Sequence, residues 1–421
     1  AVPAIRGCPY HDDPLWPKEF LCARCRSANN AAKEYGVEFV PGHRRFSRIQ
    51  GNEYTNEAKL LGLKDIQAIA RGRSPSDPRV FTGTGVLRAN RGILFIDELP
   101  AIRTKVQVLL HPVLEEKKAI LEEYNWEHFL DIVLAATGNP SGFSHVNEVP
   151  RPLLDRLELI YMDLPEEDTE REIMLREKFA VHEHHADSPV EHDDLSYPTL
   201  DDIERRVVAP WWTMDLINAA VRQSRTCPFL DKSASIRATT KAIDHTYASV
   251  ELDGRRVARL DDVARGLRLA LRGRIGLRAD LIDYESPKAT LKKTDELSQY
   301  LLCSALADFD FRFTGDKDRL AVEIDSVLAD GMENLTTTLQ RCPELSSAIG
   351  QLTGLARDKL TDGFNETERA LAQHPDRLDP QTLDEYNRSA LELVCNLAWH
   401  RRVVGDQVAD TVFVPRAGTF A

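Results

Sequence analysis

A short, uninterrupted apolar run is the feature that most constrains this chain. It covers residues 92–96, Gly-Ile-Leu-Phe-Ile, and ends directly in Asp97 and Glu98. Because both faces of such a strand are apolar, the run predicts a central strand of a parallel sheet, buried on both faces. A second buried strand is predicted over residues 131–136, and it ends in Thr-Gly-Asn-Pro at 137–140.

Helical patterns separate and follow these strands. Apolar residues recur at helical spacing between Val106 and Leu114, which predicts an amphipathic helix over residues 101–118. Buried strands that alternate with helices are typical of an α/β fold with a parallel sheet. From residue 166 the strand signal disappears and helical patterns continue to the end of the chain. We therefore predict three domains: an α/β core (1–165), a helical lid (166–290) and an all-helical C-terminal domain (291–421).

Charge and composition limit the partners that the chain can have. A formal net charge of −13 over 421 residues argues against a large nucleic-acid interface, which needs clustered Lys and Arg. No apolar run reaches the roughly 20 residues of a membrane span, and the N-terminus has no signal-peptide core. We therefore expect a cytoplasmic protein with no membrane span.

The polar residues that follow the two predicted strands suggest phosphate chemistry. Ligands of open parallel sheets bind beyond the carboxyl ends of the strands. There, Asp97 can hold the water shell of Mg²⁺, Glu98 can activate a water molecule, and Asn139 can hydrogen-bond a phosphate or that water. Asp97 and Glu98 also fit a simpler interpretation, an acidic pair at a helix N-terminus.

Several segments, in order along residues 1 to about 275, resemble AAA+ ATPases of the magnesium-chelatase-I and MoxR type. Residues 89–99 look like the Walker B segment, and residues 106–116 like the helix after it. Further similar segments are 135–140 (sensor 1), 151–157 (arginine finger) and 235–238, 253–255 and 261–263 (the lid with its sensor 2 arginine).

The resemblance implies ATP and Mg²⁺ as cofactors and assigns a role to each matching position. Asp97 would serve Mg²⁺, Glu98 would activate the attacking water, and Asn139 would sense the γ-phosphate. Arg237 would reach the nucleotide of its own subunit from the lid.

Two further arginines would act across a subunit interface. The resemblance implies that Arg156, with Arg151 as the second candidate, reaches into the neighbouring subunit's site. An arginine supplied in this way requires a homo-oligomer, in this family a hexameric ring. Taken singly, each arginine equally fits a surface or salt-bridge role.

The resemblance implies an ATP-hydrolysing ring that remodels a client or assists metal insertion. Its partner would be a protein with a von Willebrand factor A domain. The alternative is a non-catalytic AAA+ scaffold. A DNA-acting relative is disfavoured by the acidity of the chain, and the sequence does not identify the client.

The first 25 residues contain a candidate zinc site. Cys8 and His11 form C-x₂-H, and Cys22 and Cys25 form C-x₂-C, so four zinc-type ligands fall within 18 residues. The alternative is that these cysteines are reduced and bind no metal.

One expected motif is missing from the sequence. No Gly-x-x-x-x-Gly-Lys-Ser/Thr occurs, and residues 82–85, Thr-Gly-Thr-Gly, lack the following Lys. We predict that the gene encodes such a phosphate-binding loop upstream of Ala1. Sequencing the coding region checks this, and an upstream reading frame without the motif would favour the scaffold.

Overall fold

The computed structural model describes residues 1–74, 77–121, 126–139, 147–174, 207–329, 335–355 and 379–405. The chain divides into two compact units, Ala1–Met162 and Asp163–Ala421. Each unit has its own hydrophobic core. Among the described residues, no helix has the length and apolar character needed to cross a membrane.

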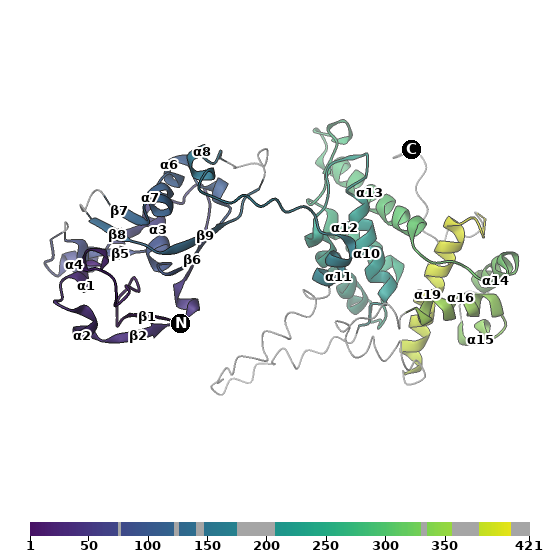
Figure 1. Ribbon diagram of the computed structural model, residues 1–421. Coiled ribbons are helices and arrows are strands. Elements are labelled where there is room, and N and C mark those ends of the chain that lie inside the picture. Colours follow the sequence, from purple (N-terminus) through teal and green to yellow (C-terminus); the bar gives the residue numbers. More distant parts are fainter. Residues whose placement is uncertain are drawn as a thin grey trace. The chain divides into compact units, whose positions relative to one another are not determined.

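The centre of the first unit is a three-stranded parallel sheet (Figure 1). Its strands are β3 (Phe46–Gln50), β6 (Gly92–Asp97) and β9 (Ile132–Ala136), with β6 in the middle. The predicted α/β fold with a parallel sheet is therefore confirmed. Both predicted strands are present, whereas β3 had not been predicted.

The two faces of this sheet differ in burial, which corrects the expectation that both are covered. Leu94 and Ile96 of β6 are fully buried, and they belong to the same core as Val106 and Leu110. Side chains of the opposite face are more exposed; Val133 of β9, for example, is 65% exposed. The physical reason is that the described helices after β6 pack on one face only.

The predicted helix over residues 101–118 is interrupted. The structure has α6 (Thr104–Gln107) and α7 (Leu110–Glu115), and a strand, β7, begins at Lys118. Pro112 lacks the N–H that would donate to the carbonyl of Val108, so one continuous helix cannot form across this point.

Short elements surround the sheet. Three antiparallel pairs are β1 with β2, β4 with β5 and β7 with β8. The bounds of the remaining strands and α-helices of this unit are β1 (Val2–Ile5), α1 (Ala23–Arg26), α2 (Ala31–Tyr35), β2 (Val37–Val40), α3 (Glu57–Leu60), β4 (Gly62–Lys64), α4 (Ile66–Ala70), β5 (Phe81–Gly83), α5 (Gly85–Arg88), β7 (Lys118–Leu121), β8 (Trp126–Phe129) and α8 (Arg151–Leu154).

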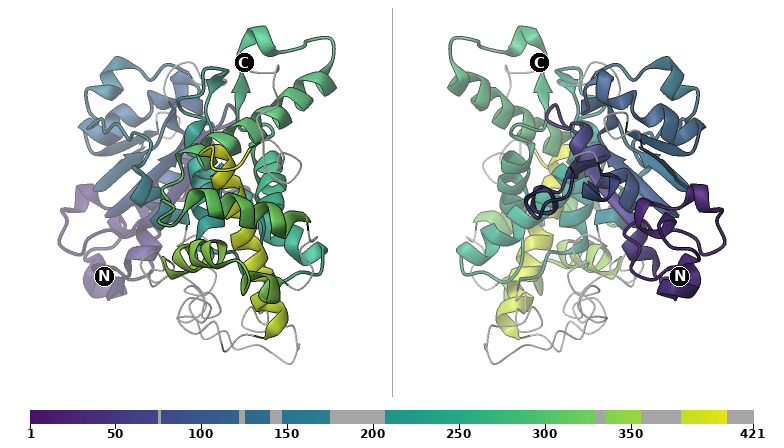
Figure 2. Two further views of the ribbon diagram at one scale, coloured as in Figure 1. Left: turned by 90° about the vertical axis from the view of Figure 1, so that its right-hand side faces the viewer. Right: turned by 90° about the vertical axis from the view of Figure 1, so that its left-hand side faces the viewer.

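The second unit is helical, as predicted for the C-terminal region (Figures 1 and 2). Its described elements are α10 (Trp211–Gln223), β10 (Leu230–Lys232), α11 (Ile236–Leu252), α12 (Leu260–Leu271), β11 (Gly276–Leu277), α13 (Pro287–Asp308), α14 (Lys317–Ala329), α15 (Leu335–Leu339), α16 (Pro343–Gly354) and α19 (Pro380–His400). Residues 175–206 of the predicted lid lie outside the described residues.

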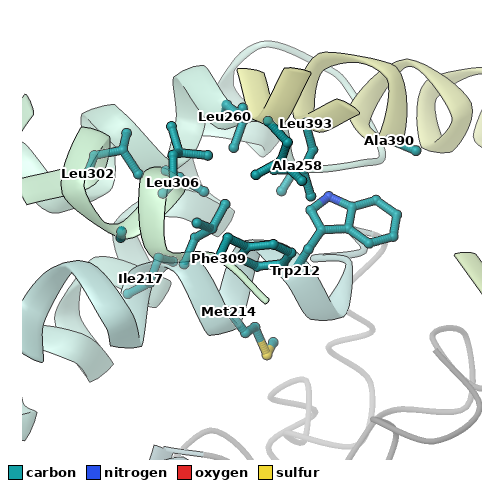
Figure 3. Close-up of a cluster of buried hydrophobic side chains, with 14 of the residues drawn as sticks. Trp212, Met214, Ile217, Ala258, Leu260, Leu302, Leu306, Phe309, Ala390 and Leu393 are labelled. Atoms are coloured by element: carbon teal, nitrogen blue, oxygen red, sulfur yellow. The ribbon is translucent and has the colours of Figure 1, made fainter. Parts of the chain in front are cut away.

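A tryptophan at the start of α10 joins the early and late helices of this unit (Figure 3). Trp212 is fully buried, and its indole N–H donates to Ser389 Oγ of α19 at 3.2 Å. The Ser389 hydroxyl in turn donates to the carbonyl of Ala258, just before α12, at 2.7 Å. The lid and C-terminal regions thus share one core, and the predicted boundary at residue 290 falls within α13.

Two helical glycines of this unit give opposite expectations. A Cβ on Gly266 of α12 would lie 2.4 Å from Thr246 Oγ1 and 2.6 Å from the carbonyl oxygen of Ala242. Gly350 of α16 has no atom within 4 Å of such a Cβ. Gly266→Ala should therefore destabilise the protein by about 1–3 kcal/mol through overpacking. Gly350→Ala should stabilise it by up to about 1 kcal/mol. Urea unfolding measures both, and equal signs would contradict the close packing of α11 on α12.

Candidate functional site

The candidate site lies where β6 and β9 end. Asp97 is the last residue of β6, and its carboxylate accepts two hydrogen bonds. Thr137 Oγ1, just after β9, donates to Asp97 Oδ1 at 2.8 Å, and Arg48 of β3 donates to Asp97 Oδ2 at 2.6 Å. The Asp97 side chain is 27% exposed and that of Arg48 is 59% exposed. One carboxylate is thus held by its two neighbouring strands while remaining open to solvent.

The backbone turns sharply at Glu98. Its φ and ψ are 58° and 53°, a left-handed conformation that costs a non-glycine residue about 1–3 kcal/mol. The Glu98 N–H donates to Thr137 Oγ1 at 3.1 Å, and the next N–H, of Leu99, donates to the Thr137 carbonyl at 2.9 Å. Thr137 therefore holds the turn in place, and the Glu98 side chain is exposed beside Asp97.

A glycine permits the close approach of β3 to this turn. The N–H of Gly51 donates to the carbonyl of Asp97 at 2.7 Å. A Cβ at Gly51 would lie only 2.2 Å from the Glu98 carbonyl oxygen. Backbone atoms cannot move out of such a contact without a large energetic cost. A side chain at position 51 would therefore push the strand ends apart.

Asn139 lies two residues after Thr137 and is exposed. The intervening Gly138 packs closely on Pro100, since a Cβ there would lie 2.7 Å from Pro100 Cγ. The segment after β9 thus runs alongside the turn that follows Glu98. Asp97, Glu98 and Asn139 accordingly occupy the same end of the sheet.

The structure gives the two candidate finger arginines different surroundings. Arg156, just after α8, forms an ion pair with Glu115 of α7 and also donates to the carbonyl of Pro152. Arg151, at the start of α8, is exposed. Arg48, which the sequence analysis does not name, contacts Asp97.

Arg237 lies in the other unit. It is exposed in the first turn of α11.

The cysteine cluster forms, with a different fourth member from the predicted one. The thiols of Cys8, Cys22 and Cys25 and a carboxylate oxygen of Asp12 all lie within 4.8 Å of one another. His11, predicted as a ligand, is not in this group. Its backbone has a φ of 56°, and this left-handed turn brings the next residue, Asp12, to the thiols.

Burial and mutual contact affect the acid–base behaviour of this cluster. The hydrogen bond with Cys22 and burial raise the pKa of the Cys25 thiol above its ordinary value. Burial lowers the pKa of the neighbouring His128 to about 4, so its imidazole is neutral near pH 7.

Sequence reasoning missed three residues that contact the predicted ones: Arg48, Thr137 and Asp12. Arg48 lies on β3, whose sequence Phe-Ser-Arg-Ile-Gln is neither continuously apolar nor regularly alternating, so it gives no strand signal. Thr137 stood within the predicted sensor segment, and its position directly after a buried strand was a usable signal. Asp12 follows the more conspicuous C-x₂-H pattern.

Comparison with known proteins gives one family match. Residues 34–157 match the AAA domain of the dynein-related subfamily. This range includes β3, β6 and β9 and therefore the whole candidate site. No curated protein matches the chain.

Three similar solved structures are the following. The first is the complex of subunits BchI and BchD of magnesium chelatase, which is 18% identical in sequence. The match covers 70% of this chain and 83% of that chain, with a TM-score of 0.28. A candidate ATPase from Cytophaga hutchinsonii has 17% identity, 60% and 76% coverage and a TM-score of 0.24. NtrX from Brucella abortus has 12% identity, 62% and 52% coverage and a TM-score of 0.35. Because the identities and TM-scores are this low, these similarities assign no function to the chain, and the family match does not depend on them.

Proposed function

From the match of residues 34–157 to the AAA domain of the dynein-related subfamily, we propose that the protein is an ATP-hydrolysing subunit of an AAA+ ring. The observation that carries the proposal is the meeting of Asp97, Glu98 and Thr137 at the carboxyl ends of two adjacent parallel strands. Ligands of open parallel sheets bind at such ends.

The donor set at this site fits Mg²⁺, which prefers oxygen ligands and retains several waters. Asp97 would hold the ion through its water shell, since its carboxylate is partly open to solvent. A bound Mg²⁺ neutralises phosphate charge. The Arg48 side chain is largely exposed, so its guanidinium can move into solvent and release a carboxylate oxygen of Asp97 for the hydrated ion.

Glu98 is the proposed base. Its carboxylate is exposed next to Asp97, and its backbone is fixed by Thr137. In this position it would orient the attacking water and accept its proton, while Asn139 would hydrogen-bond the γ-phosphate.

Two features of the sheet support a phosphate-binding strand and helix beside β9. Within the described residues β9 pairs only with β6, so its other edge has room for a strand. The sheet face that includes Val133 is apolar and largely exposed, so it has room for a helix. A loop between such elements would face Asp97.

The arginines provide the reason for a ring. We propose that Arg156, or else Arg151, contributes positive charge to the neighbouring subunit's nucleotide in a hexamer. Arg156 would then have to exchange its ion pair with Glu115 for that contact. Arg237 would reach the nucleotide of its own subunit from the lid.

The ring would remodel a client or assist metal insertion, together with a partner that has a von Willebrand factor A domain. The alternative remains a non-catalytic AAA+ scaffold. The next two experiments distinguish them.

We predict that Glu98→Gln lowers ATP turnover by about 10²- to 10⁴-fold and leaves ATP binding unchanged. The amide keeps the shape of the side chain but cannot accept a proton. Turnover and nucleotide binding are measured on the protein in its natural full length. Glu158→Gln, which changes an exposed carboxylate outside the site, is the control and should behave as wild type. Near wild-type turnover in Glu98→Gln would remove Glu98 from the mechanism, and no turnover in the wild type would favour the scaffold.

We predict that Arg156→Ala lowers turnover by about 10³-fold while each subunit still binds nucleotide. Mixing Arg156→Ala with Glu98→Gln subunits should restore some hydrolysis, because an intact arginine can then face an intact glutamate.

The ion pair with Glu115 supplies the matched control. Glu115→Ala removes the same pair but keeps the arginine, so it should retain turnover. If Glu115→Ala is as inactive as Arg156→Ala, or if mixed rings show no recovery, Arg156 acts within its own subunit.

A further inference from the structure

Four buried groups meet at one point of the first unit, outside the candidate nucleotide site. They are the three thiols of Cys8, Cys22 and Cys25 and the carboxylate of Asp12. All four residues are buried, and Asp12 is fully so. A carboxylate without solvent needs a compensating positive charge or several hydrogen bonds.

The local backbone brings these groups together. Cys8 follows a turn at Gly7, whose φ is 68°. Cys22 is the N-cap of α1 and Cys25 lies within that helix, so the short helix presents both thiols on one side. The left-handed turn at His11 completes the arrangement by directing the chain into Asp12.

We propose that Cys8, Cys22, Cys25 and Asp12 bind one Zn²⁺ ion in a tetrahedral structural site. Zinc–sulfur bonds of about 2.3 Å place two sulfur ligands of a tetrahedron about 3.8 Å apart. The Sγ atoms of Cys8 and Cys22 lie 3.7 Å apart. Thiolates select zinc over the hard cations Mg²⁺ and Ca²⁺.

Hydrogen bonds to the proposed ligand residues have the arrangement expected around a bound metal ion, because they hold the ligand atoms in place. The N–H of Asp12 donates to Cys8 Sγ at 3.4 Å, and the N–H of Cys22 donates to Asp12 Oδ2 at 2.6 Å. His128 Nε2 of β8 lies 3.4 Å from Asp12 Oδ1.

The ligand segment is also attached to the AAA core. Tyr10, between Cys8 and Asp12, donates through its hydroxyl to the carbonyl of Phe81 at 3.2 Å. The Asn90 side chain donates to the Tyr10 carbonyl at 2.7 Å and accepts from the N–H of Asp131 at 3.0 Å. Because Asn90 and Asp131 precede β6 and β9, the zinc site would stabilise the ends of these strands that lie opposite Asp97.

The first test is the metal content of the protein. Elemental analysis of the purified full chain should give about one zinc per chain. Cys25→Ser should lose it, whereas Cys303→Ser, a substitution of an equally buried cysteine in the other unit, should retain it. If Cys25→Ser does not fold, the Tm of the wild-type protein provides the test. A metal chelator should lower this Tm by several degrees, and adding Zn²⁺ but not Mg²⁺ should restore the original Tm.

The second test identifies the fourth ligand. Asp12→Asn should weaken zinc binding by at least about tenfold. His11→Asn, which suits the left-handed backbone, should leave zinc binding unchanged. The reverse result would overturn the assignment of Asp12. A wild-type chain that takes up no Zn²⁺ when refolded with it would overturn the site itself, as would a disulfide among these cysteines, detected as two fewer thiols than the seven in the sequence.

Discussion

The parallel pairing of β6 with strands on both sides is the constraint on which the first unit depends. Leu94 and Ile96 remain out of water only if this strand lies inside a sheet, and that requirement brings β3 and β9 against it. Parallel strands end at the same edge, so three polar segments distant in sequence meet there. The ion pair between Arg48 and Asp97, and the contacts of Thr137 with Asp97 and Glu98, follow from this topology.

The second unit is organised by burial of a large aromatic side chain rather than by a sheet. Trp212 is enclosed by helices from both ends of the unit, and its indole N–H needs a hydrogen-bond acceptor once it is out of water. Ser389 Oγ provides that acceptor, and its own hydroxyl donates a hydrogen bond to the Ala258 carbonyl. These two hydrogen bonds link α10, α19 and the segment that begins α12.

Continuous apolar runs were the most informative part of the sequence. They were sufficient to predict β6, β9 and the α/β fold, because only burial explains them. They were not sufficient for β3, in which polar Ser47 and Arg48 interrupt the apolar residues, nor for the helix break, which depends on one missing N–H at Pro112. Spacing suggested His11 as a companion of the cysteines, but backbone handedness, which spacing does not encode, brings Asp12 there instead.

The left-handed backbone at Glu98 has a consequence for how this position can vary. Glycine would relieve the torsional cost and asparagine would reduce it, but both discard the carboxylate. β-Branched residues such as valine would be sterically strained at this positive φ and would supply no group for the proposed reaction. Folding and the proposed hydrolysis therefore favour different residues at this position: the left-handed turn favours glycine or asparagine, whereas the proposed base requires the carboxylate of glutamate.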